Sequence, residues 1–157
     1  MIDPNMVRDF LAQHRIAVVG VSAASSSFGN TIYRELRSRG YDVVAVNRST
    51  DTAEGDPCYP DVLSVPGTLD GVIVMVKASS AEQVLRDCAE RGVKRVWLFR
   101  GLGGPGALSK ETEALAQELG LEVIPGACPL MFLEPVKGAH RFHRAMRRMN
   151  GSLAKAS

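Results

Sequence analysis

Short apolar runs alternate with amphipathic segments along the chain. The apolar runs are rich in β-branched residues and predict buried strands at residues 16–19, 43–46, 72–76, 95–99 and 123–124. Between them, apolar residues recur every three or four positions, which predicts helices at about residues 29–39, 80–91 and 109–119. Asp3 or Asn5 is expected to cap a short first helix that ends near Gln13, while residues 48–70 are expected to be irregular and rich in turns.

This alternation predicts an α/β fold, a Rossmann-like doubly wound sheet of about five parallel strands with helices on both faces. We expect the strand order 3-2-1-4-5, with the first and fourth strands parting at the switch point. Ligands of such sheets bind there, outside the carboxyl ends of the strands. The loops that start near Gly20, Asn47, Val76 and Arg100 are therefore the candidate site. No internal repeat or linker divides the sequence, so we expect a single domain over residues 1–157.

The loop after the first strand partly matches a dinucleotide-binding fingerprint. That fingerprint would place glycines at positions 20, 22 and 25, and the chain has Gly20, Ser22 and Ser25. Small side chains still allow backbone N–H groups to approach a phosphate at a helix N-terminus. The alternative is a serine-rich surface turn. No Gly-Lys-Ser/Thr follows, which excludes a Walker A loop.

The second strand ends in a basic rather than an acidic sequence. Enzymes that bind NAD usually place a carboxylate there for the ribose hydroxyls, whereas this chain has Asn47, Arg48 and Ser49. A guanidinium favours an additional ribose phosphate, which both NADP and coenzyme A carry. A solvated loop arginine is the alternative.

The composition indicates the compartment. The chain has 157 residues, of which 45% are hydrophobic, and its start lacks the cationic and apolar regions of a signal peptide. No apolar stretch reaches the roughly 20 residues of a membrane span. Cys58, Cys88 and Cys128 are widely spaced, which disfavours disulfides and a zinc site. We therefore expect a cytoplasmic protein without membrane association.

The C-terminal segment is basic. From Lys137 onward there are six basic residues and no acidic one, and residues 137–149 are expected to form a terminal helix. Its arginines are interpreted as a solvated face and its apolar stripe as a core, a protein-partner contact or a homo-oligomer contact. Phe142 is its single aromatic residue, which gives nucleic-acid binding little support. His140 and His143 could present a metal pair, but no acidic third ligand lies nearby, so we expect no metal site.

Several short strings together resemble the CoA-binding domain family, small Rossmann-like proteins similar to the CoA-binding domain of the succinyl-CoA synthetase α subunit. The resemblance covers roughly residues 14–136. The strings are Val18-Val-Gly-Val-Ser22, Phe28-Gly-Asn30, Tyr33-Arg-Glu-Leu36, Gly40-Tyr41, Val46-Asn47, Tyr59-Pro60, Gly92-Val-Lys-Arg-Val-Trp97-Leu98 and Cys128-Pro129.

The resemblance implies that coenzyme A lies across the carboxyl edge of the sheet. By position, Ser22, Ala23, Ala24 and Ser25 match the family's diphosphate loop, and Gly20, Val21, Phe28 and Asn30 are further expected cofactor-binding residues. Asn47 and Arg48 match the adenosine-side loop, Val76 and Lys77 match the turn after the third strand, and Phe99, Arg100 and Gly101 match the loop along the pantetheine. Residues near Val76 and Phe99 are expected to line the pantetheine. The family commonly has proline at position 48, and many members have proline or arginine at position 77.

No catalytic constellation emerges from the sequence. We find no Ser-His-Asp set, paired carboxylates or His/Cys cluster, so the chain is interpreted as a non-catalytic carrier, sensor or partner protein that binds coenzyme A or an acyl-CoA. An NADP-dependent oxidoreductase and a regulatory interaction protein with a vestigial nucleotide pocket are the alternatives. Cys128 is interpreted as a small packing residue, with a mixed disulfide to the CoA thiol as the alternative.

Overall fold

A computed structural model describes residues 2–100 and 106–133 of the chain. The expected terminal helix at 137–149, with His140 and His143, lies outside the described residues, as does Gly101. Within the described residues, no helix is long and apolar enough to cross a membrane.

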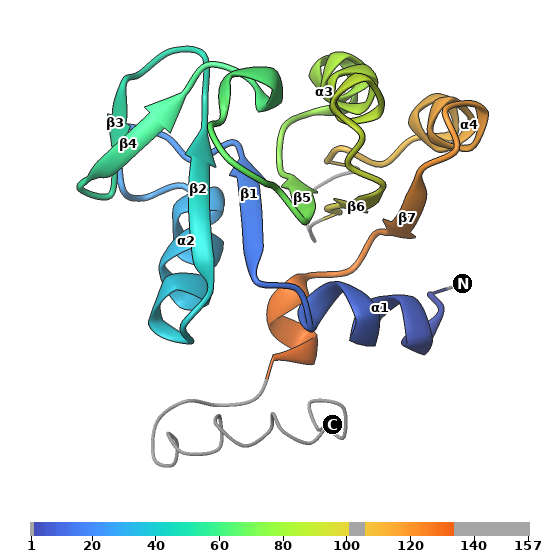
Figure 1. The fold of residues 1–157 in the computed structure, drawn as a ribbon, viewed down its shortest axis with the longest axis horizontal. Coiled ribbons are helices and arrows are strands. Elements are labelled where there is room, and N and C mark those ends of the chain that lie inside the picture. Colours follow the sequence, from blue (N-terminus) through green and yellow to red (C-terminus); the bar gives the residue numbers. More distant parts are fainter. Residues whose placement is uncertain (1, 101–105, 134–157) are drawn as a thin grey trace.

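One mostly parallel sheet runs through the described residues (Figure 1). Its strands are β1 (Arg15–Val19), β2 (Asp42–Val46), β3 (Thr52–Ala53), β4 (Asp56–Tyr59), β5 (Gly71–Val74), β6 (Arg95–Leu98) and β7 (Glu122–Pro125). They follow the order β3-β4-β2-β1-β5-β6-β7, in which β3 is antiparallel to β4 and the other pairs are parallel. The α/β, Rossmann-like fold class is thereby confirmed.

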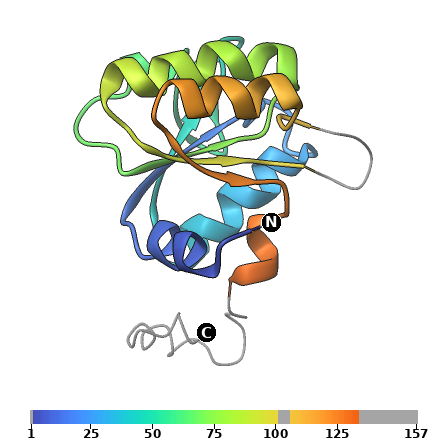
Figure 2. The ribbon, with the colours of Figure 1, turned by 90° about the vertical axis from the view of Figure 1, so that its right-hand side faces the viewer.

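The helices cover both faces of the sheet, also as expected (Figure 2). They are α1 (Pro4–Leu11), α2 (Phe28–Ser38), α3 (Ala78–Arg91) and α4 (Lys110–Glu118), with two 3₁₀ turns, η1 (Val62–Ser64) and η2 (Pro129–Phe132). Figure 2 shows α3 and α4 on one face and α1, α2 and η2 on the other.

The expected strand order 3-2-1-4-5 is wrong in one respect. The third strand of the prediction, β5, pairs with β1 from Ile16↔Gly71 onward rather than with β2. The place beside β2 is taken by β4, in the segment that the sequence analysis treats as irregular. Counted with β4 as the third strand, the parallel sheet has the doubly wound order 3-2-1-4-5-6, and its switch point lies between β1 and β5.

β4 is hard to detect from the sequence because its signals are weak. It has four residues, one of which is Pro57, and proline is tolerated only near the edge of a sheet. The β3–β4 turn consists of Glu54 and Gly55, both with positive φ, where Asn-Gly would be the usual sequence. Ion pairs of 2.7 Å from α2 to this hairpin, Arg34 to Glu54 and Arg37 to Asp56, hold it in place.

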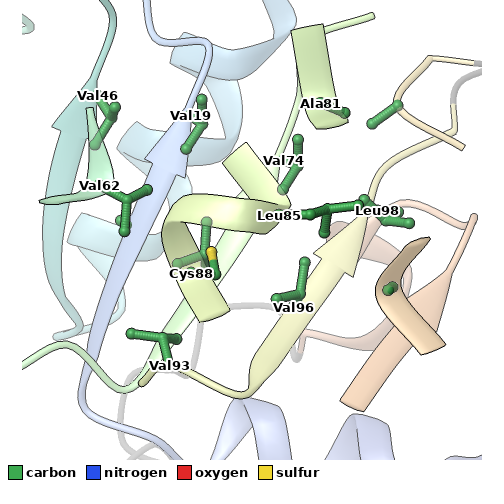
Figure 3. Close-up of a cluster of buried hydrophobic side chains, with 14 of the residues drawn as sticks. Val19, Val46, Val62, Val74, Ala81, Leu85, Cys88, Val93, Val96 and Leu98 are labelled. Atoms are coloured by element: carbon green, nitrogen blue, oxygen red, sulfur yellow. The ribbon is translucent and has the colours of Figure 1, made fainter. Parts of the chain in front are cut away.

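Successive residues of a strand point to opposite faces of the sheet and so contribute to two separate hydrophobic cores. Ala17 and Val19 of β1 belong to the cluster under α3 and α4, part of which Figure 3 shows. Ile16 and Val18 belong to the cluster under α1 and α2, with the fully buried Trp97. Burial on both faces explains why the strands read as continuous apolar runs.

The helix starts confirm the expected caps. The Asp3 carboxylate accepts a hydrogen bond from the backbone N–H of Asn5 (2.9 Å), which caps α1. Ser109 and Thr112 form a capping box at the start of α4, with hydrogen bonds of 3.0 and 2.8 Å. Such reciprocal caps satisfy N–H groups that have no partner within the helix.

Candidate functional site

The β1–α2 loop is built on a close contact between two glycines. Gly20 has a φ of +117° and donates its N–H to the carbonyl of Val46 (2.9 Å). A Cβ at Gly29 would lie 2.4 Å from the carbonyl oxygen of Gly20. The glycine that lets the helix pack on the strand is therefore Gly29, not a residue at position 25. The loop thus keeps the close strand-to-helix contact of the dinucleotide-binding fingerprint, but more residues separate its first and last glycines.

Asn30 organises this loop from a fully buried position. Its Oδ1 accepts hydrogen bonds from the Ser22 N–H (2.8 Å) and the Ser27 hydroxyl, and its Nδ2 donates to the Ser22 carbonyl (2.9 Å) and to Glu54 Oε2 (2.7 Å). Two acceptor and two donor contacts exhaust the capacity of an amide. Asn30, which is expected as a ligand contact, holds the loop through these four hydrogen bonds.

The outer part of the loop presents backbone donors. Residues 23–26 are exposed, and within the described part of the chain their N–H groups donate no hydrogen bond. They precede the first turn of α2, where the helix dipole favours an anion. The Ser22 hydroxyl donates to the Ala24 carbonyl (2.6 Å), so it braces the loop. The anion-binding capacity thus rests on backbone N–H groups.

A cleft of about 400 Å³ opens between α3 and the η1 turn, over the carboxyl ends of β1 and β2. It is lined by Gly20, Asn47, Arg48 and Val76 of the expected site, and by residues that the sequence analysis did not select. The latter are Val19, Val46, Pro60, Asp61, Val62, Leu63, Ser80, Gln83, Val84 and Asp87. The lining thus combines aliphatic side chains with a few polar groups from three segments, which is the usual make-up of a small-molecule site.

Two neighbouring residues at the mouth of the cleft, Asn47 and Arg48, differ in whether their side chains already have partners. Asn47 is engaged: its Nδ2 donates to the Val21 carbonyl (2.9 Å), and its Oδ1 accepts from the Ser49 N–H (2.8 Å). Arg48 is exposed and forms no ion pair with any described residue. The guanidinium of Arg48 is therefore available to an anionic ligand, while Asn47 ties the two loops together.

Two phenylalanines meet beside the switch point. Phe28 begins α2 and Phe99 follows β6, and their ring centroids lie 5.4 Å apart at an interplanar angle of 40°. Phe28 is 44% exposed, so the pair presents an apolar surface to solvent. Lys77, at the N-cap of α3, and Arg100 are exposed and do not line the cleft. Most of the expected residues thus divide between the cleft, the β1–α2 loop and the Phe28–Phe99 pair, while Lys77 and Arg100 belong to none of these.

The three thiols are free. Burial raises the pKa of Cys58 above its ordinary value and raises that of Cys88 to about 12, so both are protonated at neutral pH. Cys128 is half-buried and packs against the cluster around Trp97, whose indole N–H donates to the Gly126 carbonyl (3.0 Å). These contacts suit the packing role expected for Cys128.

Arg91 fixes the far wall of the cleft. From the last turn of α3 its guanidinium donates to the carbonyls of Val62 (2.8 Å), Val65 (2.5 Å) and Gly67. The η1 segment has little other regular structure, so these bonds set its distance from α3. No local sequence pattern marks this role, because the partners lie 24 to 29 residues away.

Replacement of Arg91 with alanine is expected to lower the free energy of unfolding by about 2 kcal/mol, since three carbonyls lose a charged donor. Chemical denaturation followed by the fluorescence of Trp97 measures the change. Arg86→Ala is the control, because Arg86 lies exposed on the same helix without a hydrogen bond to any described residue. Equal stability of the two variants would show that the η1 segment does not depend on Arg91.

Comparison with known families identifies the class. Residues 14–134 match the model of a family described as the CoA binding domain. The chain therefore belongs to the CoA-binding domain family, which confirms the resemblance seen in the short sequence strings.

The curated relatives include longer enzymes. An ADP-forming acetate–CoA ligase I of Archaeoglobus fulgidus is 31% identical over 118 residues, which cover 72% of this chain and 17% of that protein. The alpha subunit of the ADP-forming acetate–CoA ligase II of Pyrococcus furiosus is 30% identical over 129 residues, which cover 78% of this chain and 28% of the subunit. The chain thus spans less than a third of the length of either relative.

Solved structures share the fold. A hypothetical protein from Pyrococcus horikoshii OT3 superposes with a TM-score of 0.74 at 27% identity, covering 83% of this chain and 89% of that one. The dinucleotide-forming acetyl-coenzyme A synthetase 1 of Ca. Korarchaeum cryptofilum superposes with a TM-score of 0.59 at 33% identity, covering 69% of this chain and 25% of that one. The same domain thus occurs both in small proteins and within a larger synthetase.

Proposed function

We propose that this protein binds coenzyme A or an acyl-CoA at the carboxyl edge of its sheet and does not itself catalyse a reaction. The observation that carries the proposal is the cleft at the carboxyl edge of the sheet, which is lined by Gly20, where the β1–α2 loop begins, and by Arg48, which forms no ion pair with any described residue. Membership of the CoA-binding domain family supports the choice of ligand.

Each part of the edge suits one part of the ligand. The free N–H groups of residues 23–26 would bind the diphosphate, and Arg48 would bind the ribose 3′-phosphate. The aliphatic walls of the cleft would accept the adenine base. The exposed Phe28–Phe99 pair would lie against the pantetheine.

The part of the relatives that this chain matches is 17% of one ligase and 28% of the other ligase subunit. We propose a binding role for this part, without catalysis of its own. It would act as a carrier, a sensor or a partner protein. An NADP-dependent oxidoreductase, the alternative from the sequence, gains no support from the matched family.

Calorimetric titration with coenzyme A, 3′-dephospho-coenzyme A, NADP and NAD tests the proposal. We expect coenzyme A to bind at least about tenfold more tightly than the dephospho form, because Arg48 makes a charge-assisted contact to the 3′-phosphate. Arg48→Ala should remove this difference, whereas Arg86→Ala, an exposed site on α3, should keep it. Tight binding of NADP without coenzyme A would refute the proposal, and absence of all binding would favour an interaction protein with a vestigial pocket.

A further inference from the structure

Asp87 is an unusual residue for a cleft that serves an anionic ligand. It lies on α3 and lines the cleft, yet it is only 7% exposed. Its Oδ1 accepts a hydrogen bond from Gln83 Nε2 (2.9 Å), while its Oδ2 has no hydrogen bond to any described residue. No cation lies within ion-pair distance of this carboxylate in the described part of the chain. A buried carboxylate with an unused oxygen calls for a donor from elsewhere.

The charges within the cleft disfavour a phosphate in its inner part. Arg48 is the single cation among the lining residues, against the carboxylates of Asp61 and Asp87. Asp61 is occupied by its own turn, since Oδ1 accepts from the N–H (2.8 Å) and the hydroxyl (2.7 Å) of Ser64. A phosphate placed beside Asp87 would meet like charge at short range, which is costly in a buried site. The inner part of the cleft therefore suits an uncharged group that donates hydrogen bonds.

Adenine is such a group. Its faces are apolar, like the valines that line the cleft, while its exocyclic amine donates hydrogen bonds. We propose that Asp87 is a specificity-determining residue of the CoA site: it accepts a hydrogen bond from the adenine amine, which places the base in the inner part of the cleft and leaves the phosphates at its mouth, beside Arg48 and the β1–α2 loop. This inference rests on the proposed binding of coenzyme A.

The positions of Gln83 and Asp87 on α3 support this role of Asp87. Ser80, Gln83, Val84 and Asp87 follow one another at helical spacing, so they form one stripe along the cleft. Gln83 donates to Asp87 and thereby holds one oxygen, which leaves the other for a ligand. A site built to accept a hydrogen bond discriminates strongly against an analogue without the donor, because its own polar group then remains unpaired.

The test compares coenzyme A with an analogue whose base is unsubstituted purine, which lacks the amine and gains no N–H in its place. Calorimetry on the wild-type protein should give at least about tenfold tighter binding of coenzyme A. In Asp87→Ala this preference should fall to about twofold or less, with no loss of affinity for the purine analogue. Asp87→Asn keeps the shape and a neutral acceptor, so it should give an intermediate preference.

Glu82→Ala is the matched control, because it removes a carboxylate from the exposed face of the same helix and should leave the preference unchanged. Thermal unfolding of each variant verifies that it is folded. Equal binding of both ligands by the wild type, or an undiminished preference in Asp87→Ala, overturns the role of Asp87 while the binding of coenzyme A stands. Binding of neither ligand by the wild type overturns the proposed function itself.

Discussion

Alanine in place of Gly29 is expected to destabilise the protein by about 3 kcal/mol, which for a chain of this length lowers the melting temperature by about 10 °C. The added methyl group would lie 2.4 Å from the carbonyl oxygen of Gly20. Both groups belong to backbone that is held on each side, Gly20 by its bond to Val46 and Gly29 by the first turn of α2. The helix must therefore move away from β1, and it takes the β1–α2 loop with it.

Gly40→Ala separates this contact from the general effect of removing a glycine. Gly40 has a φ of +91° and open space around its Cβ position, so alanine there costs only the backbone strain of about 1–2 kcal/mol. Gly29→Ala should also weaken the binding of coenzyme A, whereas Gly40→Ala should not. Thermal unfolding and calorimetry measure the two effects. A melting temperature of Gly29→Ala equal to that of Gly40→Ala would contradict the close packing of α2 on β1.

The sequence predicts well whatever depends on local periodicity. Strands buried on both faces read as apolar runs, and helices with caps such as Ser109–Thr112 show their starts directly. The strand β4 escapes prediction because pairing with β2 and ion pairs from α2 define it, rather than its own residues. Its omission changed the expected neighbours of β5 but not the fold class.

The residues of the candidate site also divide into those that the sequence predicts and those that it does not. Loops at the carboxyl ends of strands can be located from the order of elements, so Gly20, Asn47, Arg48 and Val76 were expected and do line the cleft. Asp87 lies in the C-terminal half of α3, where the sequence shows only another acidic residue of a helix. Its burial and its unused oxygen result from the packing of η1 against α3, which no local pattern encodes. The four hydrogen bonds of the Asn30 amide could not be predicted from the sequence, because one of the partners, Glu54, lies 24 residues away.

Asn30→Asp is expected to destabilise the protein by about 4 kcal/mol at neutral pH, because a carboxylate cannot donate to the Ser22 carbonyl or to Glu54. It would also face the Glu54 side chain, which is 8% exposed and shares its only ion pair with Arg34 among the described residues. Burial and like charge raise the folded-state pKa of the new carboxyl above its unfolded value.

The pH dependence of Asn30→Asp follows from this shift. A raised folded-state pKa means that the folded state binds the proton more tightly, so the variant regains stability as the pH falls and loses it as the pH rises through that pKa. Urea denaturation at about pH 5 and about pH 7.5 should therefore show a smaller deficit at the lower pH. Asn5→Asp makes the same substitution at an exposed site in the first turn of α1, where the helix dipole favours negative charge, so it should be neutral or slightly stabilising. A deficit of Asn30→Asp as small as that of Asn5→Asp, or one that does not vary with pH, would mean that Asn30 does not hold the loop through its amide.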